Sequence, residues 1–238
     1  MPDQLQKSLS TTLHEVRAWL EDLRSLGLHD LQVADLRELQ PCPPGTVGLD
    51  RGGDAGCRQE TLEEIRADLG DCQRCPLCNS RTQIVFGAGM AGSRIVFVGG
   101  APSKAADTTG EPLAGELFDR ILFALGMERS SVYVCEVVMC RPGQRPPHQD
   151  EIATCRSFLQ RQLAVIAPRI IVAMGEIPTG VLSDQGEDFS KIRGHWFKYQ
   201  GIDVMPTFDP AYLLLHPHEK REAWNDLKEV LRRMRQED

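Results

Sequence analysis

An α/β fold, with a mostly parallel sheet covered by helices on both faces, is predicted by the order of apolar patterns along the chain. Short apolar runs of strand length alternate with longer stretches that carry apolar residues at helical spacing. The chain has 238 residues and is 41% hydrophobic, which is enough for one large domain with a sizeable core. Ligands of such sheets bind beyond the carboxyl ends of the strands, so the loops there are the candidate site.

The first part of the chain is predicted to be a helical extension over residues 1–40, because apolar residues recur at helical spacing on both sides of Gly27. The Pro- and Gly-rich stretch over 41–57 has no periodicity and is predicted to be a linker. We interpret the extension as an accessory helical hairpin, with an arm that binds a protein partner as the alternative. The main domain is expected to span 58–238.

Within the main domain, each predicted strand is a short apolar run, and each long helix has apolar residues three or four positions apart. The elements follow one another in this order: helix 62–69, strand 94–100, helix 115–127, strand 131–138, helix 150–167, strand 169–175, strand 202–207 and helix 218–234. The carboxyl ends of the strands nominate four loops as the place for a site, namely 99–110, 135–148, 174–195 and 208–217.

Charge and apolar run length exclude several classes of protein. The chain has 27 Lys and Arg against 34 Asp and Glu, a net charge of −7, so it is not a general polyanion binder. Any nucleic-acid surface must be a local basic patch. No apolar run approaches the roughly 20 residues that span a bilayer, and the first residues form no apolar leader. We expect a cytoplasmic monomer without membrane contact.

Eight cysteines in a chain without a leader indicate thiol or metal chemistry in a reducing compartment. Zinc and iron–sulfur clusters both accept four cysteines, and the spacing alone does not choose between them. Cys78 could replace one of the four ligands, whereas Cys135 lies in a predicted strand and is expected to be a small apolar filler. The four candidate ligands are Cys72, Cys75, Cys140 and Cys155.

Several strings resemble, in the same order, the motifs of the family 4 uracil-DNA glycosylases. They are CQRCPLCNSRTQIVFGAG, RIVFVGGAPSKAADTTGEPLAG, SVYVCEVVMCRPGQRPP, RIIVAMG, IRG and TFDPAYLLLHP, between Cys72 and Leu227. The resemblance implies a DNA-repair glycosylase with a three-layer α/β/α fold around a four-stranded parallel sheet. It also implies a [4Fe-4S] cluster whose ligands are Cys72, Cys75, Cys140 and Cys155.

The chain departs from this family at four positions that carry function there. Gly100 stands where the family has a Glu that positions water, and Leu113 where it has a Phe that stacks on the base. Glu136 replaces the Asn that reads the uracil edge, and Asp209 replaces the His that stabilises the leaving base. The resemblance places the base pocket at Gly100, Ala101, Pro102, Leu113 and Glu136.

Two hypotheses account for these departures. In the first, the site is rebuilt: Glu136 accepts hydrogen bonds from a guanine-type edge and Asp209 orients the water, with Asp107 as a second candidate catalytic carboxylate. An ionised carboxylate only accepts, so uracil would be read only if Glu136 were protonated. In the second, the chain is a relative without hydrolytic activity that acts as an iron–sulfur module binding nucleic acid or a protein partner.

Contacts with DNA are expected from three segments. Arg141 and Arg145 match the family's CRPP segment, which is one residue shorter here, and would form the local basic patch. Arg193 belongs to a loop that mixes basic and aromatic residues, as nucleic-acid surfaces do. Tyr212 and Leu214 lie in the family's wedge loop, where apolar side chains enter a base step, and Leu213 is expected in the core.

Overall fold

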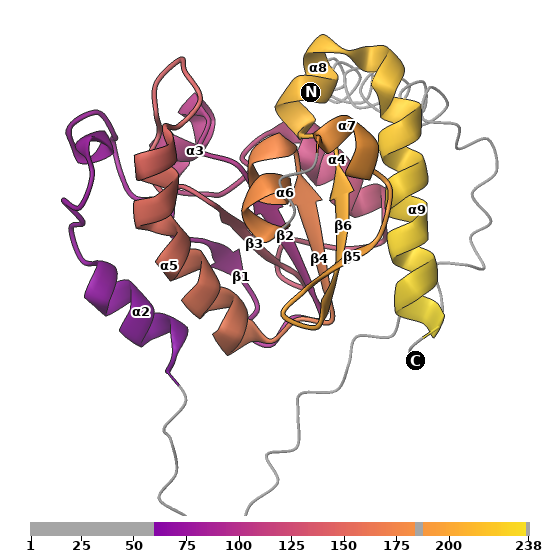
Figure 1. The fold of residues 1–238 in the computed structure, drawn as a ribbon, viewed down its shortest axis with the longest axis horizontal. Helices are drawn as coiled ribbons and strands as arrows, with labels where there is room; N and C mark the ends of the chain where they lie inside the picture. The colour runs from indigo at the N-terminus through magenta and orange to yellow at the C-terminus, as the bar shows by residue number, and fades with distance from the viewer. Residues whose placement is uncertain (1–59, 184–187, 237–238) are drawn as a thin grey trace, which may run out of the picture.

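The computed structural model describes residues 60–183 and 188–236, and within these ranges the predicted α/β architecture is present (Figure 1). The predicted extension over 1–40 and the whole predicted linker over 41–57 lie outside the described residues. The three-part division of the chain therefore stays a prediction. Among the described residues, no helix combines the length and the apolar character that crossing a membrane requires.

The sheet has six strands in the order β1-β3-β2-β4-β6-β5. Its centre is parallel and consists of β3 (Tyr133–Glu136), β2 (Ile95–Gly99), β4 (Ile170–Met174) and β6 (Ile202–Thr207). These are the four strands that the sequence predicts. At the edges, β1 (Ala88–Gly89) pairs antiparallel with β3, and β5 (Phe197–Tyr199) pairs antiparallel with β6. The expectation of four strands was wrong by these two, which are too short to form a recognisable apolar run.

Helices cover both faces of the sheet, so the fold has three layers (Figure 1). Successive strand residues point to opposite faces. Val96 and Val98 of β2 accordingly pack in the core formed with α2 (Leu62–Leu69), α5 (Gln149–Ile166) and α6 (Glu176–Leu182). Ile95 and Phe97 of the same strand pack in the second core, with α4 (Glu116–Ala124) and α9 (Lys220–Gln236). Both faces of the parallel strands are buried, which explains their continuous apolar sequence.

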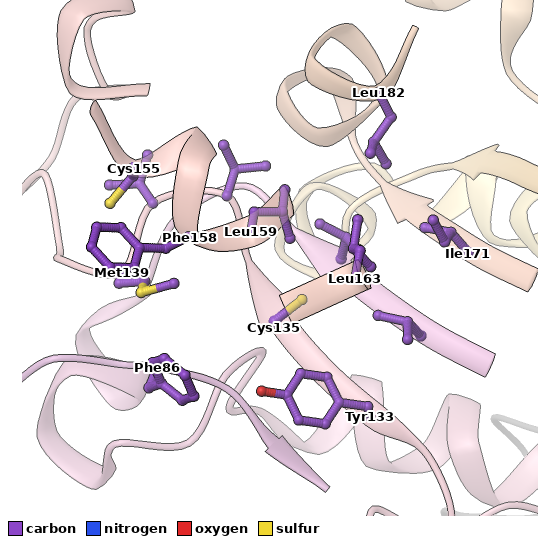
Figure 2. Packing of buried hydrophobic residues seen from close by; sticks show 14 of the residues in the cluster. Phe86, Tyr133, Cys135, Met139, Cys155, Phe158, Leu159, Leu163, Ile171 and Leu182 are labelled. Atoms are coloured by element: carbon purple, nitrogen blue, oxygen red, sulfur yellow. The ribbon is translucent and has the colours of Figure 1, made fainter. Parts of the chain in front are cut away.

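Figure 2 shows the first core, where Leu159 and Leu163 of α5 pack over Tyr133 and Cys135 of β3. Cys135 is fully buried, so its predicted role as an apolar filler is confirmed. At one end of this core Cys155 of α5 lies among the same packed residues. The core therefore continues into the cysteine-bearing end of the molecule.

Short helices occupy the loops at the carboxyl ends of the strands, where only loops were predicted. They are α3 (Lys104–Thr109), α6, α7 (Phe189–Ile192) and α8 (Pro210–Leu215), with the 3₁₀ turn η3 (Pro217–Glu219) after α8. A further 3₁₀ turn, η2 (Pro76–Asn79), precedes β1. Helices of four to six residues show no helical periodicity in a sequence. Local signals were present for α8, because Asp209 is its N-cap and Pro210 its first residue.

Candidate active-site cavity and cysteine centre

A cavity of ≈ 260 Å³ lies beyond the carboxyl ends of the parallel strands, as the topology requires. It is small for a ligand pocket and suits one compact planar group better than an extended molecule. The loop after β2, the end of β3, the first turns of α4 and α8, and the start of α9 all contribute to it. Its lining includes Ala101, Ser103, Leu113, Glu116, Leu117, Phe118, Arg120, Glu136, Asp209, Leu214 and Lys220.

Glu136 is the last residue of β3 and its side chain is 1% exposed. Its Oε1 accepts a hydrogen bond from the Leu113 N–H at 2.8 Å, while its Oε2 has no hydrogen-bond partner. Burial raises the pKa of Glu136 to about 8, against the Leu113 N–H, which lowers it, and with a further increase from the charge of Asp209. The carboxyl group is therefore mostly protonated at neutral pH and presents one O–H donor beside its acceptors.

Asp209 lies across the sheet from β3, after β6, and caps α8. Its Oδ1 accepts from the N–H groups of Ala211 at 2.7 Å and Tyr212 at 3.4 Å. Burial raises the pKa of Asp209, and these two backbone N–H groups oppose the increase. The cap fixes the carboxyl group by one oxygen, which leaves Oδ2 for a water molecule or a substrate. A Cβ atom at Gly175 would lie 3.1 Å from the Asp209 Cβ, so only glycine leaves full room for the carboxyl there.

Three other residues predicted for the site do not line this cavity. Asp107 lies on α3 with its Oδ1 accepting from the Thr82 N–H at 2.8 Å, so its carboxyl holds a neighbouring loop. Gly100 faces Ile177, whose Cδ1 would lie 3.2 Å from a Cβ at that position. Pro102 is buried and outside the lining. Of the five predicted base-pocket residues, the cavity brings together Ala101, Leu113 and Glu136.

Sequence reasoning missed the wall that α4 and α9 provide. Glu116, Leu117 and Arg120 come from the first turns of α4, and Lys220 begins α9. The predicted helix over 115–127 directly follows the PLAG string, which was a usable signal for the first three. No local signal marks Lys220, because its position depends on how α9 packs against the sheet.

The predicted basic patch is largely engaged in ion pairs. Arg145 binds Glu151 with both terminal nitrogens, at 2.8 Å and 2.6 Å. Arg193 binds Asp226, at 3.0 Å and 2.8 Å, and also Glu222. These two arginines hold structure together rather than stand ready for phosphates. Arg141 is half-buried, and its described contact is made by its backbone carbonyl, which accepts from Ser80 Oγ.

The wedge segment on α8 is exposed beside the cavity. Leu214 and Leu215 are 62% and 80% exposed, and Leu214 also lines the cavity. Tyr212 is held between two rings, with centroid distances of 5.2 Å to Phe208 and 4.0 Å to His216. Tyr212 is 39% exposed, but its ring is engaged in these two stacking contacts, which support the segment. The next residue, Leu213, is buried, as predicted.

Cys72, Cys75, Cys140 and Cys155 are free thiols that gather at one end of the first core. Burial raises the pKa of Cys155 to about 12, against a hydrogen bond with the Met139 backbone, which lowers it, and with a further increase from the charges of the other three thiols. Guanidinium groups accompany them: Arg81 Nη1 lies 3.4 Å from the Cys140 Sγ, and Arg74 Nη1 lies 3.5 Å from the Cys72 Sγ.

Four thiols with two adjacent cations form a donor set that fits a cysteine-ligated iron–sulfur cluster, whose thiolates carry negative charge. Among the described residues, no three His, Cys, Asp or Glu side chains are arranged to hold a single metal ion. The charge of Cys78 raises the pKa of Cys75, and Cys78 remains the thiol that could replace one of the four predicted ligands.

Comparison with known proteins identifies several relatives. Residues 86–228 match the family model described as the uracil DNA glycosylase superfamily. The chain is 38% identical over 184 residues to a type-4 uracil-DNA glycosylase of Sulfurisphaera tokodaii, covering 72% of this chain and 84% of that protein. It is 37% identical over 180 residues to a type-4 uracil-DNA glycosylase of Thermotoga maritima, covering 73% and 91%. A type-5 uracil-DNA glycosylase of Pyrobaculum aerophilum is 29% identical over 162 residues.

Proposed function

The chain belongs to the uracil-DNA glycosylase superfamily, and on that premise we propose that it is a DNA N-glycosylase that removes uracil from a flipped nucleotide. The observation that carries the proposal is the buried Glu136 carboxyl, which lines the cavity with one oxygen unpartnered. An enzyme that acts on a base within a duplex must extrude it and bind its edge in a pocket. We assign this role to the cavity at the strand ends.

Glu136 in its protonated form can read the edge of uracil. Its Oε2–H donates to the O4 carbonyl of the base, and Oε1, which keeps a second lone pair, accepts from the N3–H. A neutral carboxyl thus offers the same donor and acceptor as the amide that the resemblance leads one to expect there. This favours uracil over the guanine-type edge, which an ionised Glu136 would bind.

Asp209 is the carboxylate that we assign to the water molecule. Ionised and fixed by its cap, it would orient and deprotonate the attacking water and stabilise the positive charge that develops on the sugar. The two carboxyl groups then need opposite states, with Asp209 ionised and Glu136 protonated. Excision should follow a bell-shaped pH profile that rises as Asp209 ionises and falls through about pH 8.

The contacts with DNA that we propose are fewer than the sequence predicted. Leu214, with Leu215 beside it, would enter the base stack next to the extruded nucleotide. Arg141 remains available for a phosphate, because the contact described for it is made by its backbone carbonyl and not by its guanidinium group. Tyr212 would act by supporting α8.

A [4Fe-4S] cluster would be held by Cys72, Cys75, Cys140 and Cys155. When bound, it would supply iron–thiolate bonds that tie the segment around η2, the loop after β3 and α5 together. The thiol ligands suit a reducing compartment, which agrees with the cytoplasmic monomer expected from the sequence. The part of the chain before residue 58 is proposed as the accessory or partner-binding segment.

The test is a strand-cleavage assay on anaerobically purified full-length protein, with single- and double-stranded oligonucleotides that carry uracil, hypoxanthine, xanthine or normal bases. We expect abasic product from uracil. Asp209→Asn should lower the rate by roughly a hundred- to a thousandfold without loss of DNA binding. Glu136→Gln should retain excision within about tenfold, because the amide reproduces the neutral acid.

The alternative outcomes are informative. Preferred excision of a purine with adjacent N–H donors would indicate that Glu136 acts as an ionised acceptor. Binding without any abasic product would favour the second hypothesis, a module without hydrolytic activity. Undiminished turnover by Asp209→Asn would exclude the role assigned to that residue.

A further inference from the structure

Arg129 lies outside the cavity, yet its guanidinium group grips the loop that forms one cavity wall. Nη1 donates to the Pro112 carbonyl at 2.9 Å and Nη2 donates to the Leu113 carbonyl at 3.0 Å. Its Nε donates to Asp119 at 2.7 Å, and the group lies 4.9 Å from the centre of the Phe118 ring. Both terminal nitrogens of the guanidinium group thus donate to the loop, and the Asp119 carboxylate balances its positive charge.

The gripped residue has an unfavourable backbone conformation. Leu113 has φ 49°, in the left-handed region that side-chain-bearing residues avoid. Such a conformation persists only where surrounding contacts hold it. Arg129 binds the carbonyls on both sides of the Leu113 N–Cα bond and so supplies that restraint directly.

The restrained peptide is also the hydrogen-bond donor to Glu136. The Leu113 N–H donates to Oε1 at 2.8 Å, and the Leu113 side chain lies over Gly99, where a Cβ would be only 2.6 Å from the Leu113 Cδ2. The loop therefore both fixes one oxygen of Glu136 and covers the acid from water. A loop that moved would release the oxygen and admit solvent.

We propose that Arg129 is a positioning residue that acts through the 112–113 peptide to determine which oxygen of Glu136 carries the proton toward the base. Its grip keeps Oε1 as the bonded acceptor, so that Oε2 carries the proton toward the substrate. This inference rests on the proposed function, because it concerns the same base-reading acid.

The charged and titratable groups around Glu136 do not duplicate this role. Asp209 faces it from the α8 cap, and Cys135 precedes it on β3. Glu116 and Arg120 on α4, which pair with each other at 2.6 Å, and Lys220 on α9 line the same cavity. The hydrogen bonds described for the Pro112 and Leu113 carbonyls come from Arg129.

The experiment compares Arg129→Met with a matched control, Arg233→Met. Arg233 also lies over an aromatic ring, 5.0 Å from the centre of Trp196, and its Nε also donates to an aspartate, Asp203, at 3.1 Å. It contacts no cavity residue among its described partners. Both variants lose a cation over a ring and an ion pair, but only Arg129→Met releases the loop.

In Arg129→Met, water should reach Glu136, and since burial is the largest cause of its raised pKa, the alkaline limb of uracil excision should move down by about one pH unit. Arg129→Lys keeps the charge but not the paired donors, so its alkaline limb should lie between those of the wild type and Arg129→Met. Arg233→Met should lose comparable thermal stability and keep the wild-type pH profile. Equal profiles for the Arg129 and Arg233 variants would overturn the positioning role.

A second measurement keeps the two proposals separable. Carbon-13 titration of the Glu side chains in the full chain, with the Glu136 signal assigned by its absence in Glu136→Gln, reports this acid without turnover. If the wild type excised no base, the proposed function would fail. A downward move of the Glu136 midpoint in Arg129→Met alone would still support the positioning role, and an unmoved midpoint would refute it.

Discussion

Two glutamates with the same small exposed fraction differ in charge: Glu136 at the end of β3 and Glu151 at the start of α5. Glu136 and Glu151 are each 1% exposed. The bidentate contact with Arg145 lowers the pKa of Glu151 to about 2, whereas burial without a cation raises the pKa of Glu136 to about 8. Depth and partner act together: Glu136 is deep in the molecule, whereas Glu151 lies under the Arg145 side chain, which is itself 39% exposed.

The two charge states match two different roles. Glu151 also accepts the His148 N–H at 2.7 Å, and so fixes the start of α5 and the loop between Cys140 and Cys155. All of its oxygens are used, as a structural ion pair requires. Glu136 keeps one oxygen unpartnered in the cavity, where that oxygen is available to a ligand.

The largest effect is expected from the loss of a proposed cluster ligand, Cys140, at the Glu151 end of the molecule. If the proposed iron–sulfur cluster is bound, Cys140→Ser should abolish its visible absorption and lower the melting temperature, because one of the proposed thiolate ligands is lost. Cys78→Ser is the matched control and should keep both. Loss of the absorption in Cys78→Ser, with its retention in Cys140→Ser, would show that Cys78 is the ligand instead.

A smaller change would make Glu151 resemble Glu136. Arg145→Met leaves the Glu151 carboxyl without its cation, which should lower the unfolding free energy at neutral pH. The loss should shrink below the usual Glu pKa, where the carboxyl is neutral in both states. In the double variant that also carries Glu151→Gln, much of the lost stability should be recovered. Chemical denaturation at several pH values measures this cycle, and strictly additive losses would contradict the pairing.

A third change makes Glu136 permanently neutral and isolates its contribution to stability. In the unfolded chain the group titrates near 4.5, and in the folded protein near 8. Its contribution is therefore present in full below pH 4.5 and is lost as the pH rises through 8. Relative to wild type, Glu136→Gln should gain stability between pH 5 and 9 by a few kcal/mol, at about 1.4 kcal/mol per tenfold change in proton affinity. A stability difference between Glu136→Gln and wild type that is the same at every pH would contradict the raised pKa.

The sequence allowed the four parallel strands and the long helices to be predicted, because each has a run or a period of its own. Strands such as β1 and helices such as α7 have neither, and they form only where the neighbouring elements place them. The resemblance also located the acids of the site. Glu136 and Asp209 both line the cavity, whereas Asp107 does not.

What could not be predicted depends on contacts between distant parts of the chain. The state of Glu136 depends on a backbone N–H 23 residues away and on the charge of Asp209. Arg193 was interpreted as a DNA contact from the basic and aromatic composition of its loop, and no local pattern indicates its pairing with Asp226, which lies 33 positions further on. For Arg145 a local signal existed, since Glu151 is six residues away, but the spacing alone does not reveal that the carboxyl is buried.

The absence of a side chain at Gly99 has a consequence for how this pocket can be redesigned. A Cβ there would lie 2.6 Å from Leu113 and 3.2 Å from the Glu136 Cγ, so the strand end and the wall compete for the same volume. A mutational path that enlarges residue 99 before residue 113 is reduced would cross a damaged intermediate. Libraries that seek a new base preference should therefore vary positions 99 and 113 together, in opposite directions of size.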